Sequence, residues 1–385
     1  MFDRKKVIYV PALRMKRGEL EGLAWLQPDV ADCIAPLLIV PPAKERDCGS
    51  QESFFETADG VPDVGAAVAK YWVHRQVFVD VKALFKEKSG QEADGWLPAI
   101  FARARSMGVF AIPVATIGTL EKMGVGAFKS TLLADAKLKF GLRIESGDLA
   151  DPSLDLRIKA VLSSMGLSAS ACTVFADFSD ADLSIPSVVE PIIRGALEQL
   201  QTLGHWQLIC FLGTHYPEKI PADPGETFTQ PRNEWRAWKA AIKFEPSTAE
   251  HMIFGDFGAD NAKIDFRSGG GAQPIVHCRY TTQESWMIVR GDNEGNWFHR
   301  MKAVYGRIVD SGKFSGPEFS EADRLIYDVA QKNAQSVGGP SAWRQVNTTH
   351  HITRVVADIA TVRSIPISTL PTAPVGAQQE LMEGF

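Results

Sequence analysis

The chain has 385 residues, of which 45% are hydrophobic and 23% charged, and its formal net charge is −5 at pH 7. This composition is typical of an ordinary globular protein and excludes a disordered chain or one embedded in a membrane. The charge also argues against nucleic acid as a partner, because no global basic field would attract it.

Cysteine usage and the start of the chain both indicate a cytoplasmic protein. The cysteines are odd in number and show no CxxC spacing, which is typical of a reducing compartment. Residues 1–6 lead directly into the first predicted strand, so the sequence predicts neither a signal peptide nor a transmembrane span, and we expect no membrane partner. The five cysteines are Cys33, Cys48, Cys172, Cys210 and Cys278.

Eight short apolar or β-branched runs recur along the first 260 residues, and most are followed by a helix-like stretch. This alternation predicts a parallel sheet, and near-continuous apolar strands predict that both of its faces are covered. We therefore predict an α/β fold, a closed (β/α)8 TIM-like barrel whose chemistry lies at the carboxyl ends of the strands. The runs are Val7–Val10, Ile34–Val40, Val77–Val81, Val109–Thr116, Phe140–Glu145, Cys172–Phe178, Leu208–Leu212 and Met252–Asp256.

One intervening helix illustrates the helical pattern. Its apolar positions recur at the spacing of an amphipathic helix. They are Val188, Ile192, Ile193, Ala196, Leu197 and Leu200.

The chain is longer than the roughly 250 residues of a bare barrel. We assign residues 1–262 to the barrel, with a loop insertion near 41–63, and residues 263–363 to a C-terminal extension that packs on the barrel mouth. Alternation between residues 276 and 289 predicts a β-hairpin in this extension. Residues 364–385 have three prolines and no periodic pattern, so we expect a flexible tail.

Helices complete the predicted extension. They are expected near residues 298–309, 321–334 and 350–359. Thr348 or Thr349 is the expected N-cap of the last one, since hydroxyl side chains cap helix N-termini.

Charged and polar residues follow most of the predicted strands and should meet at the mouth. Several carboxylates with a few cations can hold a divalent metal or supply an acid and a base. The alternative is that they cap helices or pair with one another at a solvated rim. The residues are Lys16, Glu19, Asp80, Lys82, Arg143, Glu145, Asp177, Asp180, His215, Asp256 and Asp260.

The end of the eighth strand carries two acids around two glycines, in residues 255–260 (GDFGAD). Such a turn lets a ligand approach the backbone closely. With residues 213–215, it occupies the position where barrels often bind phosphate. The sequence contains no P-loop, GxGxxG, HExxH or GxSxG motif, so nucleotide, dinucleotide, zinc-protease and serine-hydrolase functions lack direct support.

A second polar cluster lies in the extension. It comprises Arg279-Tyr280, Trp343-Arg344 and His350-His351. Adjacent residues on a helix point about 100 degrees apart, so we expect one histidine to face the barrel and the other to contact solvent. A structural hydrogen bond from a histidine is the alternative role. Trp238 is expected to pack in the core or at an interface.

Several motifs in this order resemble the beta family of proteins, which is named after a phage beta protein and found in phages and bacteria. The resemblance covers nearly the whole chain. It implies an association with phage biology and mobile or defence loci, including antiphage defence, but no catalytic residues, because the family is functionally uncharacterised. The motifs are Tyr9-Val10-Pro11-Ala12-Leu13, Lys16, Gly18-Glu19, Arg232-Asn233-Glu234-Trp235, Trp238, Gly255-Asp256-Phe257-Gly258, Arg279-Tyr280-Thr281, Ser311-Gly312-Lys313-Phe314, Trp343-Arg344 and Thr349-His350-His351-Ile352.

The first functional hypothesis is a barrel that binds a small phosphorylated ligand and hydrolyses a phosphoester, with a divalent metal as a candidate cofactor. Asp177 and Asp256 are candidate metal ligands or bases, and His350 or His351 is a candidate proton donor. The ligand-binding candidates, with Lys16 and Arg344 as anion clamps, are Lys16, Glu19, Asp80, Glu145, Arg279, Tyr280, Trp343 and Arg344.

The second hypothesis is a recognition or regulatory module that binds a phage component or a partner protein without turnover. Exposed tryptophans among Trp235, Trp286, Trp297 and Trp343 would mark the interface. The sequence leaves both hypotheses open.

Overall fold

The computed structural model describes residues 7–42, 57–58, 61–86, 93–243, 252–263, 274–332 and 336–369. The expected loop insertion near 41–63 lies partly outside these residues, and the expected tail lies outside them from residue 370 onward. Within the insertion, β3 (Thr57–Ala58) and β4 (Val61–Pro62) form a short antiparallel pair.

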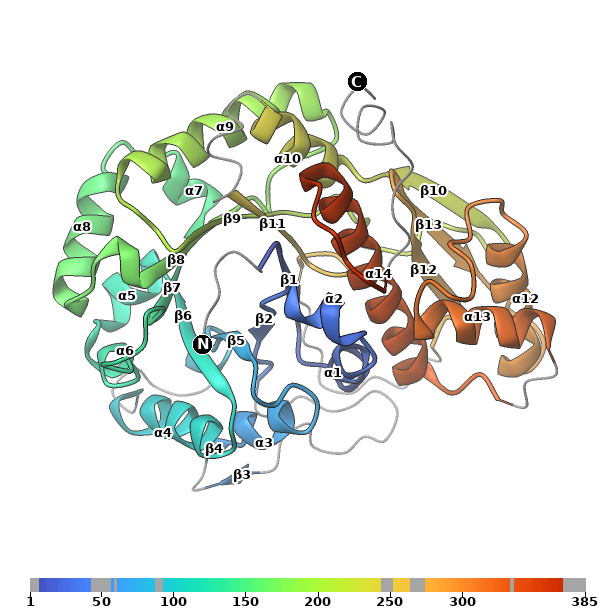
Figure 1. Cartoon of the computed structure of the whole chain (residues 1–385), viewed down its shortest axis with the longest axis horizontal. Coiled ribbons are helices and arrows are strands. Elements are labelled where there is room, and N and C mark those ends of the chain that lie inside the picture. The colour runs from blue at the N-terminus through green and yellow to red at the C-terminus, as the bar shows by residue number, and fades with distance from the viewer. Residues whose placement is uncertain are drawn as a thin grey trace.

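Eight parallel strands close into a barrel, which confirms the predicted (β/α)8 fold (Figure 1). The closing pair joins β11 to β1, with Tyr9 opposite Phe254 and Pro11 opposite Asp256. In order around the barrel the strands are β1 (Tyr9–Leu13), β2 (Leu37–Ile39), β5 (Gln76–Asp80), β6 (Phe110–Thr116), β7 (Phe140–Glu145), β8 (Cys172–Asp177), β9 (Leu208–Leu212) and β11 (Met252–Asp256).

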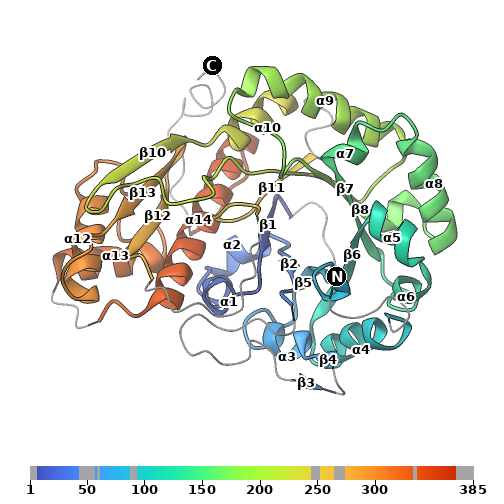
Figure 2. The same cartoon turned by 180° about the vertical axis from the view of Figure 1, so that it is seen from behind.

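Helices surround the barrel and cover the outer face of its strands (Figures 1 and 2). Leu84–Lys86 and Ala169–Ala171 add single 3-10 turns. The helices are α1 (Arg17–Ala24), α2 (Pro28–Asp32), α3 (Val64–Ala69), α4 (Ala93–Ser106), α5 (Ile117–Met123), α6 (Gly126–Lys129), α7 (Ser146–Leu149), α8 (Leu154–Met165), α9 (Pro186–Thr202) and α10 (Asn233–Lys243).

Successive residues of each strand face opposite sides of the barrel wall. On β8, Phe175 belongs to the apolar core inside the barrel, and on β11 so does Ile253. Phe254 belongs instead to the core between the barrel and the helices. Asp177, two residues after Phe175, therefore faces the inside, whereas Asp256, two residues after Phe254, faces the helices.

A small subdomain stands beside the barrel and contains the predicted hairpin and helices. Its antiparallel sheet has the order β10–β13–β12, and its own apolar core includes Tyr305, Ile308 and Ile326. The first strand of this sheet comes from the chain before residue 262, so the sheet draws on both parts of the predicted domain division. Its elements are β10 (Thr227–Pro231), β12 (His277–Thr281), β13 (Ser285–Arg290), α12 (Trp297–Val309) and α13 (Glu321–Gln331).

The last helix, α14 (Pro340–Arg363), lies between the barrel and the small subdomain (Figures 1 and 2). It packs closely on α1, where a Cβ added at Gly22 would lie 2.8 Å from Thr348 Cβ. Because the helix spans Pro340–Arg363, the predicted helix over 350–359 was too short, and the predicted N-cap at Thr348 or Thr349 was wrong. The helix begins at Pro340, a residue well suited to the first helical turn. No helix among the described residues combines the length and apolar content needed to cross a membrane.

Candidate functional site

The inner face of the barrel carries a buried charge cluster near the carboxyl ends of the strands, here called the floor cluster: Asp80, Arg143 and Asp177. Arg143 Nη1 lies 2.8 Å from Asp80 Oδ2, and Arg143 Nη2 lies 2.6 Å from Asp177 Oδ2. Burial alone would lower the pKa of Arg143, but the charges of Asp177 and Asp80 outweigh it and raise that pKa. The guanidinium therefore stays charged and locks both carboxylates.

A second ion pair at the strand ends is open to solvent. Lys82 Nζ lies 2.6 Å from Glu145 Oε1, and the two side chains are 43% and 42% exposed. Lys82 follows β5, the strand that carries Asp80, and Glu145 ends β7, the strand that carries Arg143. A ligand in the mouth can reach this pair more readily than the floor cluster.

An arginine-rich cluster lies where β1 and β11 end and is here called the rim cluster: Arg14, Glu19, Asp260, Arg279 and Arg344. Arg344 Nη1 lies 3.3 Å from both Glu19 Oε1 and Asp260 Oδ2, and Arg279 Nη1 lies 2.7 Å from Asp260 Oδ1. Arg14 pairs with the same two carboxylates. Three cations facing two carboxylates leave one positive charge in excess.

The loop after β1 is held in place by Glu19. Its Oε2 accepts a hydrogen bond from the backbone N–H of Arg14 at 2.7 Å and reaches the N–H of Lys16, the N-cap of α1, at 3.4 Å. Between them, Met15 has a φ of 53°, which is uncommon for a residue with a side chain. This carboxylate thus fixes both the loop and its neighbouring arginines.

The close charges of the rim cluster shift the pKa values of its members. Burial favours a raised pKa for Glu19, but Arg14, Arg344 and Lys16 outweigh it and lower that pKa. Burial, together with repulsion from Arg344 and Arg279, lowers the pKa of Arg14 to about 10. The arginines repel one another, so a further anion bound here would reduce this repulsion.

On the outer face of the wall, a buried network joins the barrel to α14 and is here called the seam cluster: Tyr9, Asp256, Thr281 and His351. Tyr9 Oη donates to Asp256 Oδ1 at 2.5 Å, and His351 Nε2 lies 3.0 Å from Asp256 Oδ2. His351 Nδ1 lies 2.9 Å from Thr281 Oγ1, and Trp286 stacks on the imidazole. Burial lowers the pKa of His351, which favours its neutral form.

Next to the seam cluster lie three more fully buried charged residues. Arg232 Nη1 donates to Asp358 Oδ2 at 2.8 Å, while Glu234 accepts from the backbone N–H of His215 at 3.1 Å. Burial raises the pKa of Glu234 to about 7, although the charge of Arg232 opposes this. Sequence reasoning noticed Arg232 and Glu234 only as motif residues, and it missed Asp358.

The other predicted site residues of the extension lie in the core of the small subdomain. His350 Nδ1 lies 2.9 Å from Asp323 Oδ2, and Tyr280 Oη donates to the other oxygen of that carboxylate at 2.7 Å. Trp343 is buried and donates through Nε1 to the carbonyl of Val337. The expectation that one of the adjacent histidines contacts solvent was wrong, because both are buried.

The candidate residues therefore do not share the one cavity that we expected, but lie in several separate places. Asp80 and Asp177 lie inside the barrel, and Glu145 lies at the solvent-exposed end of its strand. Glu19, Arg279 and Arg344 meet at the rim. Asp256 meets His351, but on the outer face of the wall. Sequence reasoning did not single out Arg14. Within the described residues, no group of three or more His, Cys, Asp or Glu side chains is arranged to hold a metal ion.

The tryptophans of α10 pack in the core. Trp235 and Trp238 are fully buried, with ring centroids 5.2 Å apart, and both contact Phe254 on the outer face of β11. This confirms the expected core position of Trp238.

Closed parallel strands, surrounding helices and charged residues at the strand ends define a (β/α)8-barrel protein. A family model described as Beta protein matches residues 9–357. The chain therefore belongs to the Beta protein family, which confirms the resemblance inferred from its motifs. A search of curated proteins gave no match.

Proposed function

We propose that this protein binds a small phosphorylated ligand at the mouth of its barrel, with the rim cluster as the anion-binding element. The observation that carries the proposal is the excess positive charge of Arg14, Arg279 and Arg344 around Glu19 and Asp260. Each guanidinium has five N–H donors in a geometry that suits phosphate. Arg344 is 31% exposed and is accessible to a ligand.

The position of α1 adds to this attraction. The helix begins at Arg17, directly beside Glu19 and the loop that carries Arg14. Its first backbone N–H groups and the positive end of its dipole favour a nearby anion. Lys82 and Glu145 offer further polar contacts at the strand ends.

Phosphoester hydrolysis remains a prediction from the sequence. Of its four catalytic candidates, Asp177 is paired with Arg143, and Asp256, His350 and His351 are buried in networks of their own. A metal-assisted reaction has no ligand set within the described residues. Binding is therefore the function that the geometry supports best, and turnover is a separate question for assay.

Isothermal titration of the full chain with inorganic phosphate, sugar phosphates and nucleotides tests the proposal. We expect binding to weaken about tenfold or more in Arg344→Gln, since hydrogen bonds to charged groups contribute roughly 1.5–3 kcal/mol. Arg324→Gln on α13 is the matched control, because its side chain is exposed away from the rim cluster. Absence of binding to every member of the panel, or equal affinity in both variants, would reject the proposal.

A release assay on the same panel addresses turnover. Phosphate release is measured with and without Mg²⁺, and Glu145→Gln is compared with wild type, because Glu145 is an accessible carboxylate at the mouth. If hydrolysis occurs there, release should fall in the variant. Ligand binding without release would identify a recognition barrel.

The second candidate function, a recognition module, is favoured by an apolar stripe on α9. Ile185, Val188 and Ile192 are 57%, 61% and 63% exposed, while Ile193 and Leu197 of the same helix are buried. Val188 and Ile192 thus turn away from the core. Exposed apolar side chains in one line are typical of a surface for a partner protein with an apolar face.

Of the four tryptophans in the module hypothesis, Trp297 alone remains a candidate interface residue. Trp235, Trp286 and Trp343 are buried, and only Trp297 among the four is partly exposed. A test of the module is Val188→Ser with Ile192→Ser, compared with Leu133→Ser at another exposed apolar position. Loss of a biological effect in the α9 variant but not in the control would support it.

A role in phage biology or antiphage defence is a further part of the proposal and rests on the family resemblance alone. Plating efficiency of phages on cells that express the wild-type chain tests it. Arg344→Gln and the α9 variant then separate the two candidate functions, because each disables a different surface. Unchanged plating across a broad phage panel would remove this role.

A further inference from the structure

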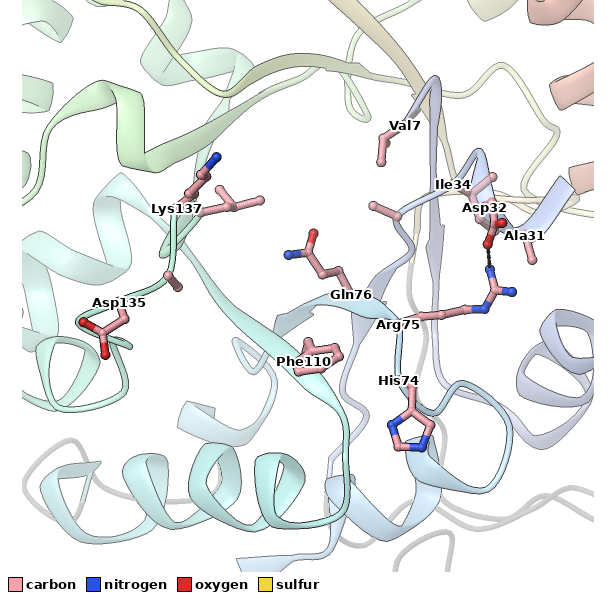
Figure 3. A pocket seen from close by; sticks show the side chains of 13 residues that line it. Val7, Ala31, Asp32, Ile34, His74, Arg75, Gln76, Phe110, Asp135 and Lys137 are labelled. Atoms are coloured by element: carbon pink, nitrogen blue, oxygen red, sulfur yellow. Dashed lines mark hydrogen bonds and ion pairs between the residues drawn. The ribbon is translucent and has the colours of Figure 1, made fainter. Parts of the chain in front are cut away.

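A recess opens at the amino ends of the barrel strands, at the opposite end of the barrel from the mouth (Figure 3). Its volume of about 480 Å³ falls within the range of roughly 300–1,000 Å³ typical of small-molecule sites. Its lining comes from residues that precede or begin β1, β2, β5, β6 and β7. Side chains at this end of a barrel ordinarily serve stability, so a recess here requires its own explanation.

The recess has an apolar floor and one half-exposed aromatic wall. Val7, Ala35 and Leu138 line it and belong to the apolar core inside the barrel. Phe110 begins β6 and shares the inward face of Ile112, yet it remains 50% exposed. An aromatic ring held half open beside an apolar floor offers a stacking surface for another planar ring.

A polar group in the recess has no partner among the described residues. Gln76 begins β5, and its Oε1 is buried and makes no hydrogen bond to any residue that the structure describes. Figure 3 shows its amide between Phe110 and Lys137, and Lys137 lies in the segment that precedes β7. A buried amide oxygen without a partner is costly, and a ligand N–H placed beside it removes that cost.

The charges around the recess cancel. Arg75 Nη1 lies 2.6 Å from Asp32 Oδ1, and the dashed line in Figure 3 marks this pair. Lys137 and Asp135 also line the recess, and neither makes an ion pair with a described residue. Two cations and two carboxylates give no excess charge for an anion, so the recess suits a neutral ligand with both donors and acceptors.

We propose that this recess, here called the lower pocket, binds a neutral planar heterocycle of the nucleobase type. The ring stacks on Phe110, an N–H of its edge donates to Gln76 Oε1, and its acceptor atoms face Lys137. The apolar floor excludes water from the other side of the ring. This site is independent of the phosphate site proposed at the mouth, which lies at the opposite ends of the strands.

Isothermal titration of the full chain with free nucleobases and uncharged nucleosides tests the lower pocket. We expect at least one member of the panel to bind and Phe110→Ala to weaken it about tenfold or more, in line with base–aromatic stacking. Gln76→Leu should weaken the same ligand, because it removes the acceptor. Leu133→Ala is the matched control, since it shortens another exposed apolar side chain and should leave affinity unchanged.

Two outcomes overturn the proposal. One is that no base or nucleoside binds. The other is that binding occurs with equal affinity in wild type and Phe110→Ala, which would place the ligand elsewhere.

The phosphate site and the lower pocket remain distinguishable. Nucleotide binding that depends on Arg344 but not on Phe110, without binding of any nucleoside, would support the mouth and reject the lower pocket. Nucleoside binding that depends on Phe110 and survives Arg344→Gln would support the lower pocket whether or not the mouth binds phosphate.

Discussion

The rim cluster and the seam cluster use similar groups at neighbouring strand ends, but they differ in exposure and in charge. The rim cluster has three arginines against two carboxylates, with Arg344 31% exposed. The seam cluster is fully buried, and its only carboxylate, Asp256, accepts from Tyr9 and lies beside His351. A polar network that is closed and satisfied stabilises a fold, whereas an open one with excess charge can still bind a ligand. Four predictions test this division, from the largest expected effect on stability to the smallest.

The largest loss is expected for Asp256→Ala. This change leaves the hydroxyl of Tyr9, the N–H of Gly258 and the imidazole of His351 without their buried acceptor. We expect the free energy of unfolding in urea to fall by about 3–5 kcal/mol. Asp180→Ala, at an exposed position, should change it little.

Phosphate binding by Asp256→Ala also tests the division between the rim cluster and the seam cluster. The folded fraction of Asp256→Ala should keep wild-type affinity for phosphate, because Asp256 faces α14 and not the mouth. A loss of affinity with unchanged stability would show that the seam cluster belongs to the ligand site.

The second prediction concerns pH. Burial raises the pKa of Glu234 to about 7, compared with roughly 4.3 in an unfolded chain. Between these values the native state holds a proton that the unfolded state has released, so this residue makes stability fall as pH rises. His351, whose pKa burial lowers, has the opposite sign: stability is lost as pH falls below about 6.5.

Glu234→Gln isolates the first of these contributions. Relative to wild type, its free energy of unfolding should improve between pH 5 and pH 8 by up to about 3 kcal/mol. Urea titrations at the two pH values measure the difference. Glu198→Gln on α9, which is 53% exposed, should show no such trend. If the free energies of unfolding of Glu234→Gln and wild type differed by the same amount at both pH values, the wild-type Glu234 side chain would not be stabilised in its protonated form.

Sequence patterns predicted the barrel because strand and helix periods alternate clearly. They could not predict which face of the wall Asp256 occupies. Both faces of a parallel barrel strand are apolar, so Phe254 and Ile253 look alike in the sequence although they point in opposite directions. Chain position alone therefore placed Asp177 and Asp256 at one mouth, when they lie on opposite sides of the wall.

The start of α14 was missed for a related reason. Residues 347–351 are polar and resemble a helix start, but in the structure they are buried in the middle of a helix between two cores. Arg14 was not chosen as a candidate site residue, because an arginine in a loop has no periodic signal. Its importance comes from Glu19 and Asp260, which only the fold brings together.

The third prediction tests the helix pair that both clusters share, since α1 carries Glu19 and α14 carries Arg344 and His351. In Gly22→Ala, the new Cβ would lie 2.8 Å from Thr348 Cβ, so the helices must separate. Overpacking costs roughly 1–3 kcal/mol, and the helical preference of alanine offsets part of it. We expect a net loss of about 1 kcal/mol in thermal or urea unfolding.

Gly195→Ala on α9 is the control, because an added Cβ there meets nothing within 4 Å. It should stabilise the protein by about 0.5–1 kcal/mol through helix propensity. If both alanine variants were stabilised equally, the close approach of α1 and α14 would not constrain the fold.

The smallest change in stability is expected for Arg344→Gln, the same variant that should weaken phosphate binding most. Its ion pairs with Glu19 and Asp260 are 3.3 Å long and partly exposed, and such pairs contribute roughly 0–1 kcal/mol. Phosphate affinity of the wild type should also fall as NaCl rises, because solvent screens an open cluster but not a buried one. A loss of stability comparable to that of Asp256→Ala would instead mean that the rim arginines hold the fold together and that their excess charge is not kept for a ligand.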